Sequence, residues 1–406
     1  MSITRLFQTL SILLATLVLF AGSAFADTIQ LKDGTKLEGR IIREGDGFVY
    51  IAVKIGDIEH NQFVLTEDIE KIIRSEPEAD EQAPSRPADR RTSPRDIPDG
   101  ATRVAFITLE GMVGPYMNAN SLRRSVEMLE GKDVSVVVLD FDSGGGYLSE
   151  IQKLSDVIER EIKPKYRTVS WIRSAISAAA MTSITCEEIY FTSRGSFGGA
   201  TGFFTNEQGK ATAISGDALD EVLRQMEIIS RRGQHDPLLM RAMQIGVDLS
   251  CDIDSSTGAV TWRNDLDGQY IVSTKDRILT LNSRDAERFR LSRGTADNKD
   301  ALMRLMNIPE WVEVGHEADE HQQRMRAELE RTEVQAREII AKLQIALNHN
   351  NVSRARAYLG ELRGLARRAP AWTEYPVGDL PPLTPEFFRD AEEAIDQFQR
   401  SRRPRR

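Results

Sequence analysis

The chain has 406 residues, which is too long for one ordinary domain and predicts two or three. Hydrophobic residues make up 40% of it and charged residues 28%, as is typical of a soluble globular protein with mobile segments. The net charge of −9 argues against general nucleic-acid binding.

Residues 1–26 have the layout of a secretory signal peptide. Arg5 precedes an apolar core whose densest part runs from Ile12 to Phe20, and Ala24-Phe25-Ala26 supplies the small residues of a cleavage site. An uncleaved membrane anchor is the alternative, although the apolar core is short for a span. We therefore expect an exported protein, periplasmic or secreted and in the alternative membrane-associated, whose mature chain starts at Asp27.

Residues 27–74 predict a small β module of five short strands, in an SH3-like or Sm-like barrel. The expected strands are Thr28 to Leu31, Leu37 to Ile42, Phe48 to Val53, Phe63 to Leu65 and Ile69 to Ile73. The segment has no aromatic row and no basic stripe, so protein association or self-association is favoured over RNA binding. Residues 75–100 are rich in proline and charge and are expected to be a disordered linker.

Residues 101–308 predict the main domain, in which strands and helices alternate as they do in α/β folds with a mainly parallel sheet. Val134 to Leu139 is a nearly continuous β-branched run, as expected of a strand buried on both faces. The other expected strands are Val104 to Leu109, Thr168 to Ile172, Ile189 to Phe191 and Ile278 to Thr280; the expected helices are Ser121 to Leu129, Leu148 to Ile158, Ser177 to Thr185 and Ser283 to Phe289. Residues 200–275 interrupt this alternation with helices at Gly216 to Arg232 and Pro237 to Gln244. A hairpin is expected there between Ala259 to Arg263 and Gln269 to Ser273.

The C-terminal part predicts helices. Apolar stripes in residues 309–372 predict an α-helical hairpin, whose stripes form a core or, alternatively, a coiled-coil contact. Residues 373–406 predict a last helix, starting at Thr384-Pro385-Glu386, and a basic tail. The five arginines among the last seven residues are compatible with a solvated end or with contact to a membrane surface or an acidic partner.

The chain has two cysteines, Cys186 and Cys251. An oxidising compartment would allow them to form a disulfide, and two separately buried thiols are the equal alternative. Two cysteines without nearby histidines do not make a zinc site, so no metal and no cofactor are expected.

The chemistry of the main domain is expected in two places. Ser177 follows a predicted strand, and its alanine neighbours would let a substrate backbone approach. The Gly144-Gly145-Gly146 turn follows the preceding strand and offers exposed amides. A hydroxyl facing amide donors is what acyl transfer to serine requires, although glycine turns and serines among alanines also occur for packing reasons alone. Ser174 is a second candidate hydroxyl.

The motifs resemble those of the Clp/crotonase superfamily, and within it the signal peptide peptidase A and NfeD-type membrane serine proteases. The matching segments are Asp142-Ser143-Gly144-Gly145-Gly146, Ser174-Ala175-Ile176-Ser177-Ala178-Ala179 and Gly195-Ser196-Phe197-Gly198-Gly199. Gly144 stands where these families usually have proline. The resemblance covers residues 104–200 and 275–308, and it implies a spiral core, homo-oligomers, and cleavage of peptides or membrane-protein segments. It also implies that Ser177 is the nucleophile and that the amides of Gly145, Gly146 and Ala178 are the oxyanion donors.

The general base departs from this pattern. The signal peptide peptidase and NfeD types use a lysine some 40 to 50 residues after the serine, and that window, Asp217 to Ile229, has only Arg224 as a basic residue. Arginine stays protonated and cannot serve as the base. Lys210, in a polar turn, is therefore the candidate base. His235 is expected to be a surface residue at a helix start, with a displaced base as the alternative.

Two functions follow from the sequence. The first is an exported serine peptidase that uses Ser177 and Lys210. The second is a catalytically inactive peptide-binding or scaffolding protein of the same fold. An acyl-CoA enzyme of the crotonase type is a distant third, because export removes the protein from the CoA pool.

Overall fold

The computed structural model describes residues 27–32, 36–45, 48–55, 58–65, 69–74, 100–205, 211–378 and 380–401. Contacts divide the chain into two units, residues 1–91 and 92–406, which are described separately. The predicted signal segment 1–26, almost all of the linker 75–100 and the candidate base Lys210 lie outside the described residues.

The first unit is an antiparallel sheet of five strands in the order β4-β3-β2-β1-β5. The strands are β1 (Asp27–Leu31), β2 (Lys36–Gly45), β3 (Phe48–Ile55), β4 (Ile58–Leu65) and β5 (Ile69–Ile73). Ile29 and Leu37 are paired across β1 and β2 and form the buried centre of the described part. The outer strands β4 and β5 do not pair with each other within the described ranges, so closure into a barrel stays a prediction.

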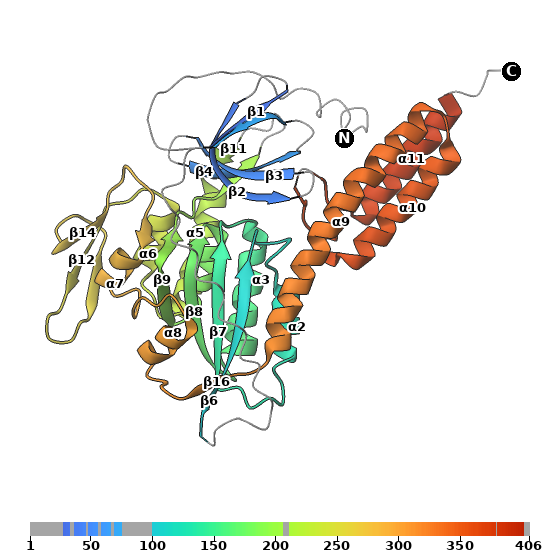
Figure 1. The fold of residues 1–406 in the computed structure, drawn as a ribbon. Coiled ribbons are helices and arrows are strands. Elements are labelled where there is room, and N and C mark those ends of the chain that lie inside the picture. Colours follow the sequence, from blue (N-terminus) through green and yellow to red (C-terminus); the bar gives the residue numbers. More distant parts are fainter. Residues whose placement is uncertain are drawn as a thin grey trace. The chain divides into compact units, whose positions relative to one another are not determined.

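The second unit is built on a six-stranded sheet in the order β15-β9-β8-β7-β6-β16 (Figure 1). The strands are β6 (Thr102–Glu110), β7 (Val136–Ser143), β8 (Arg167–Ile176), β9 (Glu188–Gly198), β15 (Thr280–Asn282) and β16 (Trp311–Glu313). All neighbouring strands are parallel except β15, which runs antiparallel to β9. The α/β class predicted from the alternating pattern is confirmed.

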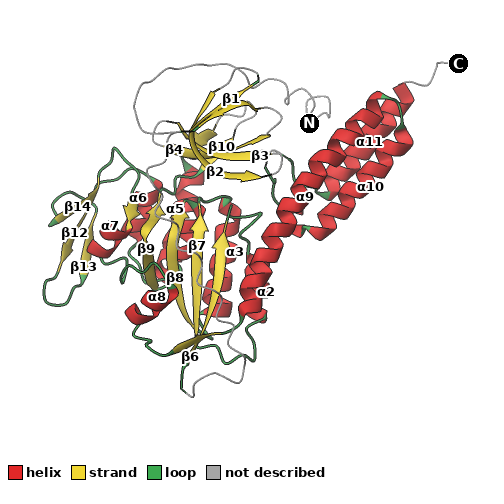
Figure 2. Ribbon diagram, viewed as in Figure 1, coloured by secondary structure: helices red, strands yellow, loops and turns green. Residues whose placement is uncertain are grey.

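The two faces of this sheet are covered differently (Figure 2). Ala105, Ile107 and Leu109 of β6 point into the larger core, together with helices α2 (Ala119–Glu127), α3 (Leu148–Val157) and α4 (Ala178–Ser183). Val104 and Phe106 alternate with them and point to the other face, where α8 (Lys299–Leu305) packs. In β7, Val137 and Leu139 lie in the larger core and Val136 and Val138 in the other, so this part of the strand is apolar on both sides, which explains its continuous hydrophobic run.

The segment between β9 and β15 corrects one prediction. Strands β13 (Val260–Arg263) and β14 (Tyr270–Ser273) do not form a hairpin, because β12 (Leu249–Ile253) lies between them and pairs with both. The Gly268 N–H, in the connection between β13 and β14, donates to the Ser250 hydroxyl of β12 at 2.9 Å. This hydrogen bond holds the connection against β12. The other elements of this segment are β10 (Phe203–Thr205), β11 (Ala211–Ala213), α5 (Asp217–Arg232), α6 (Pro237–Gln244) and, after β15, α7 (Ser283–Arg288).

The C-terminal helices are α9 (His316–Asn348), α10 (Val352–Arg368) and α11 (Pro385–Ser401), with a short helix η3 (Pro370–Thr373) between the last two. The first turns of α9 belong to the sheet domain, since the Ser125 hydroxyl of α2 donates to the Ala318 carbonyl at 2.7 Å. Its second half packs antiparallel on α10, and Arg368 at the end of α10 contacts Gln335. A separate core, centred on the fully buried Trp372, joins these helices.

Cys186 and Cys251 are both buried and both free, so the alternative of two separate thiols applies. Across the described residues no helix combines the length and the apolar content that a membrane crossing requires.

Candidate functional site

Ser177 lies at the turn from β8 into α4 in an unusual backbone conformation, with φ 55° and ψ −125°. A positive φ is strained for a residue with a side chain and is held only when the surroundings enforce it. Here the Ser177 N–H donates to the Gly198 carbonyl at 2.8 Å, and its own carbonyl accepts the first helical hydrogen bond, from Met181. The turn lifts the partly exposed Ser177 out of a buried run of alanines.

The glycine turn after β7 contacts Ser177 directly. A Cβ atom added to Gly145, whose φ is +104°, would lie 2.4 Å from the Ser177 Cβ and 3.0 Å from its Oγ. Gly145 is therefore required by backbone conformation and by the space that Ser177 fills. Gly144, in contrast, has no atom within 4 Å of an added Cβ.

A third motif segment lies on the other side of Ser177. Residues Gly195 to Gly198 are the end of β9, where Ala175 pairs with Phe197 and Ile176 with Gly198. Gly198 also pairs with Thr280 of β15, so the closing strand of the sheet reaches the same place. The three motifs, far apart in the sequence, thus meet at the carboxyl ends of neighbouring strands.

The predicted oxyanion donors differ in availability. The Gly145 N–H donates to the Ser143 hydroxyl at 3.2 Å and is already engaged. Ala178 is the first residue of α4, so its N–H has no partner within the helix. The bridge of Gly146 to Val113 uses the Gly145 carbonyl and the Tyr147 N–H, which leaves the Gly146 N–H out of that bridge.

The proton acceptor is the incomplete part of the site. Lys210, in the connection from β10 to β11, lies outside the described residues, and within them no hydrogen bond joins the Ser177 hydroxyl to a lysine or histidine. His235 is partly buried and not the surface residue expected, because its Nε2 bonds the Cys186 carbonyl at 2.8 Å. Burial lowers the pKa of His235. Since Cys186 follows the end of α4 opposite to Ser177, this histidine is not the displaced base.

Ser174 sits within β8, where it pairs with Asp142 and Ser196. Its hydroxyl is 3.5 Å from the Ser143 carbonyl. Ser174 therefore lies within the strand, whereas Ser177 lies at the turn between β8 and α4.

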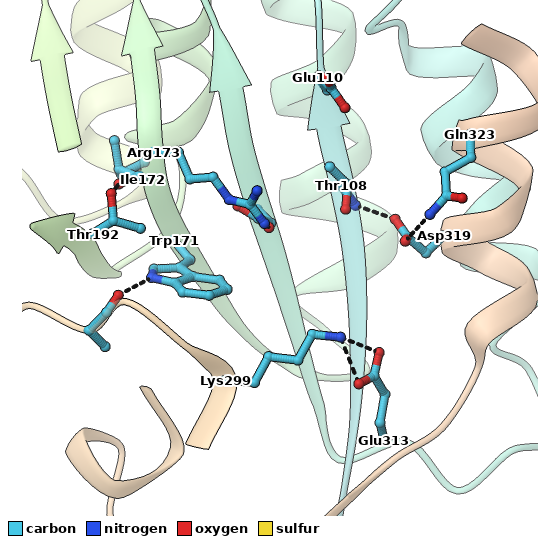
Figure 3. A network of polar contacts seen from close by, with 12 residues as sticks. Thr108, Glu110, Trp171, Ile172, Arg173, Thr192, Lys299, Glu313, Asp319 and Gln323 are labelled. Atoms are coloured by element: carbon cyan, nitrogen blue, oxygen red, sulfur yellow. Dashed lines mark hydrogen bonds and ion pairs between the residues drawn. The ribbon is translucent and has the colours of Figure 1, made fainter. Parts of the chain in front are cut away.

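A polar patch flanks the site on the α8 face of the sheet, and Figure 3 shows Arg173 and Trp171 pointing there from β8. The Arg173 guanidinium contacts the Asp140 carboxylate, whose Oδ1 has no hydrogen-bond partner within the described residues. Burial raises the pKa of Asp140 to about 6, although Arg173 acts to lower it. Asp140 follows directly on the apolar run of β7, and this buried carboxylate is the feature of the sequence that could have predicted the patch. Its partner in the structure is Arg173.

Tyr147, Glu150 and Tyr375 form a second feature that sequence reasoning did not predict. Tyr147 follows the glycine turn, and its ring lies 5.0 Å from the ring of Tyr375, centroid to centroid. The Tyr375 hydroxyl donates to the carboxylate of Glu150, which is buried on α3. Nothing in the pattern of residues 147–150 relates them to a position more than 200 residues away.

The family model of the NfeD1b N-terminal domain matches residues 103–313, just over half of the chain. The chain belongs to the NfeD1b N-terminal domain family. This confirms the relationship to NfeD-type proteins that the motifs predicted. The matched region contains Ser177 and its glycine turn and ends before α9.

Individual proteins give weaker likenesses to this NfeD1b-family chain. Membrane protein NfeD1b of Bacillus subtilis (strain 168) is 25% identical over 190 residues, which are 47% of this chain and 38% of that protein. The chain therefore spans well under half of its relative. A serine-to-alanine mutant of the 1510-N membrane-bound stomatin-specific protease is 12% identical, with a TM-score of 0.40 over 51% of this chain and 86% of that one. A ClpP1 mutant from Listeria monocytogenes is 14% identical, with a TM-score of 0.30 over 48% and 94%.

Proposed function

We propose that this NfeD1b-family protein is an exported serine peptidase in which Ser177 is the nucleophile. The observation that carries the proposal is the strained backbone of Ser177 against the Gly145 turn. Strain of about 1–3 kcal/mol is kept where function requires a side chain to be presented at a turn. A serine that served packing alone would not need this conformation.

The chemistry would run as follows at this site. The Ser177 Oγ attacks the carbonyl carbon of a peptide bond while its proton passes to the base, for which Lys210 is the candidate. The amides of Gly146 and Ala178 donate to the oxygen that becomes negative. The C–N bond breaks, the base returns the proton to the leaving amine, and water then releases the acyl group from Ser177.

Lys210 has to lose its charge to accept that proton. A lysine in water has a pKa near 10.4 and is protonated at neutral pH, so a catalytic lysine needs burial or a neighbouring cation to lower its pKa. The proposal therefore requires that the pKa of Lys210 falls far enough for its amine to be neutral when it accepts the Ser177 proton.

A fluorophosphonate probe tests the nucleophile. Wild type should be labelled, Ser177→Ala should not, and Ser174→Ala, which removes a hydroxyl from the end of β8 just before Ser177, should be labelled like wild type. Labelling that persists in Ser177→Ala, or that is absent from folded wild type, would contradict the proposal.

A pair of lysine variants tests the base. Lys210 and Lys275 are the first two lysines after Ser177 in the chain. We expect Lys210→Ala to slow labelling by about 10²-fold or more, the usual contribution of a general base, and Lys275→Ala to leave it unchanged. Equal rates in the two variants would exclude Lys210 as the base.

A second candidate function is a catalytically inactive peptide-binding or scaffolding protein. It is favoured by the absence, within the described residues, of a lysine or histidine hydrogen-bonded to the Ser177 hydroxyl. This protein would bind an extended peptide equally well in wild type and Ser177→Ala, and neither would be labelled.

The location and assembly are proposed from the same reasoning. Residues 1–26 would direct export or anchor the chain, peptide or membrane-protein segments would be the substrates, and the sheet domain would form homo-oligomers. Alkaline phosphatase fused after Asp27 tests export, and light scattering after size exclusion tests assembly.

A further inference from the structure

The C-terminal segment after α10 packs against the loop that carries the glycine turn. This segment lies outside the matched family region of residues 103–313. Tyr375 is 5% exposed, and its ring faces the ring of Tyr147, the residue directly after Gly146. Two tyrosine rings at 5.0 Å are within the range of attractive aromatic pairs.

A glycine allows these rings to approach. A Cβ atom added to Gly114 would lie 2.8 Å from the Tyr147 ring and 3.0 Å from the Tyr375 ring. Gly114 belongs to the loop of residues 111–117, which connects β6 to α2. The two rings and this loop are therefore packed without free space.

Backbone hydrogen bonds join the same loop to the glycine turn. The Val113 N–H donates to the Gly145 carbonyl at 2.8 Å, and the Tyr147 N–H donates to the Val113 carbonyl at 3.0 Å. An added Cβ on Gly146 would lie 2.2 Å from that carbonyl oxygen. The turn is thus held between Val113 on one side and Ser177 on the other.

The buried carboxylate of Glu150 holds the hydroxyl of Tyr375. Glu150, 2% exposed, accepts the Tyr375 hydroxyl and, at 2.6 Å, the N–H of Ala119 at the start of α2. Lys153 lies 3.2 Å from the Glu150 carboxylate and 3.1 Å from that of Glu374. A buried charge with several hydrogen-bond donors has little freedom to move, so Tyr375 has a fixed anchor.

We propose that Tyr375 is a positioning residue for the oxyanion donor at Gly146. It acts through Tyr147 and the 111–117 loop. The C-terminal segment of the chain thereby completes a site whose catalytic residues all lie in the family domain. The inference rests on the proposed function of Ser177, and it adds that this function depends on residues beyond 313.

The test compares three tyrosine variants by the rate of fluorophosphonate labelling and by amide hydrogen exchange in peptides covering residues 111–117 and 143–148. Tyr375→Ala removes the ring, and Tyr375→Phe keeps the ring but removes the hydroxyl. Tyr358→Ala is the control, because Tyr358 packs against the core of the C-terminal helices and no described contact joins it to the glycine turn.

We expect Tyr375→Ala to slow labelling about 10- to 100-fold, since a displacement near 1 Å at a reacting centre can cost about 10²-fold. Exchange should rise in residues 111–117 and 143–148 and stay unchanged in the peptides of β7 and β8, which shows that the domain remains folded. Tyr375→Phe keeps the ring beside Tyr147 but loses the hydrogen bond to Glu150, so its labelling rate should lie between those of Tyr375→Ala and wild type. Tyr358→Ala should change neither readout at the turn.

The outcomes separate this inference from the proposed function. If wild type is not labelled but Tyr375→Ala still raises exchange at 143–148, the peptidase proposal fails and the positioning contact stands. If wild type is labelled and Tyr375→Ala alters neither labelling nor exchange beyond Tyr358→Ala, the positioning role is overturned and the nucleophile stands. A loss of exchange protection throughout the sheet in Tyr375→Ala, with Tyr375→Phe equally slow, would also overturn it in favour of a purely structural role.

Discussion

Gly145 and Gly144 make a matched pair of substitutions that isolates the contact between the glycine turn and Ser177. In Gly145→Ala the new Cβ would lie 2.4 Å from the Ser177 Cβ and 2.9 Å from the Ile176 carbonyl oxygen, and the backbone would keep a φ of +104°. Backbone strain of this kind costs about 1–3 kcal/mol, and overpacking costs about another 1–3 kcal/mol. The sum, about 2–6 kcal/mol, is a large part of the stability of an ordinary domain.

Gly144→Ala provides the control. Its added Cβ meets nothing within 4 Å, and Gly144 is not among the residues of positive φ. The substitution should be neutral or should stabilise by up to about 1 kcal/mol, because alanine restricts the unfolded chain.

Urea denaturation measures the free energy of unfolding, and fluorophosphonate labelling measures the state of Ser177. We expect Gly145→Ala to lose about 2–6 kcal/mol and to be labelled about 10²-fold more slowly, while Gly144→Ala matches wild type in both. If the two variants were equally stable and equally labelled, the close approach of the turn to Ser177 would be refuted. The expected difference in the free energy of unfolding between the two variants does not depend on whether the protein is an active peptidase.

Three further predictions follow. Ser177→Gly should be more stable than Ser177→Ala by about 1 kcal/mol in urea denaturation, because glycine adopts a positive φ without strain; the reverse order would show that the turn is relaxed. Because burial raises the pKa of Asp140 from 3.8 to about 6, the folded state holds this proton more tightly, so its contribution is full below pH 3.8 and is lost as the pH rises through 6. Asp140→Asn should therefore gain stability relative to wild type between pH 4 and pH 6.5, by about 2–3 kcal/mol, and a constant difference across that range would contradict this. Burial raises the pKa of Cys186 to about 12, and Cys251 is also buried and free, so a thiol reagent should find two thiols in denaturant and almost none in the native protein.

The family match identifies the domain, and the local geometry identifies which residues meet within it. The family match fixes the kind of domain that carries Ser177, and it ends before α9. The geometry concerns the individual residues, of which Ser177, Gly145 and Gly198 are in contact, while Lys210 lies outside the described residues. The identity of the base is therefore the sharpest experimental question for this protein.

The sequence by itself determined the local elements and their class. The nearly continuous β-branched run from Val134 to Leu139 predicted a buried parallel strand, because a strand covered on both faces has no polar side. Helical spacing located α5, α6 and α10, and the glycine and serine motifs marked the strand ends where the site lies. These signals are short-range and can be read from neighbouring residues.

Only the tertiary structure decided which distant segments meet. The strand β12 lies between β13 and β14, and no local pattern excluded the simpler hairpin, because a connection of six residues permits either arrangement. The contact of Tyr375 with Tyr147 joins residues more than 200 positions apart through packing that composition does not encode. The positive φ of Ser177 is likewise set by its surroundings, since Gly198 and Gly145 hold a conformation that serine alone would not adopt.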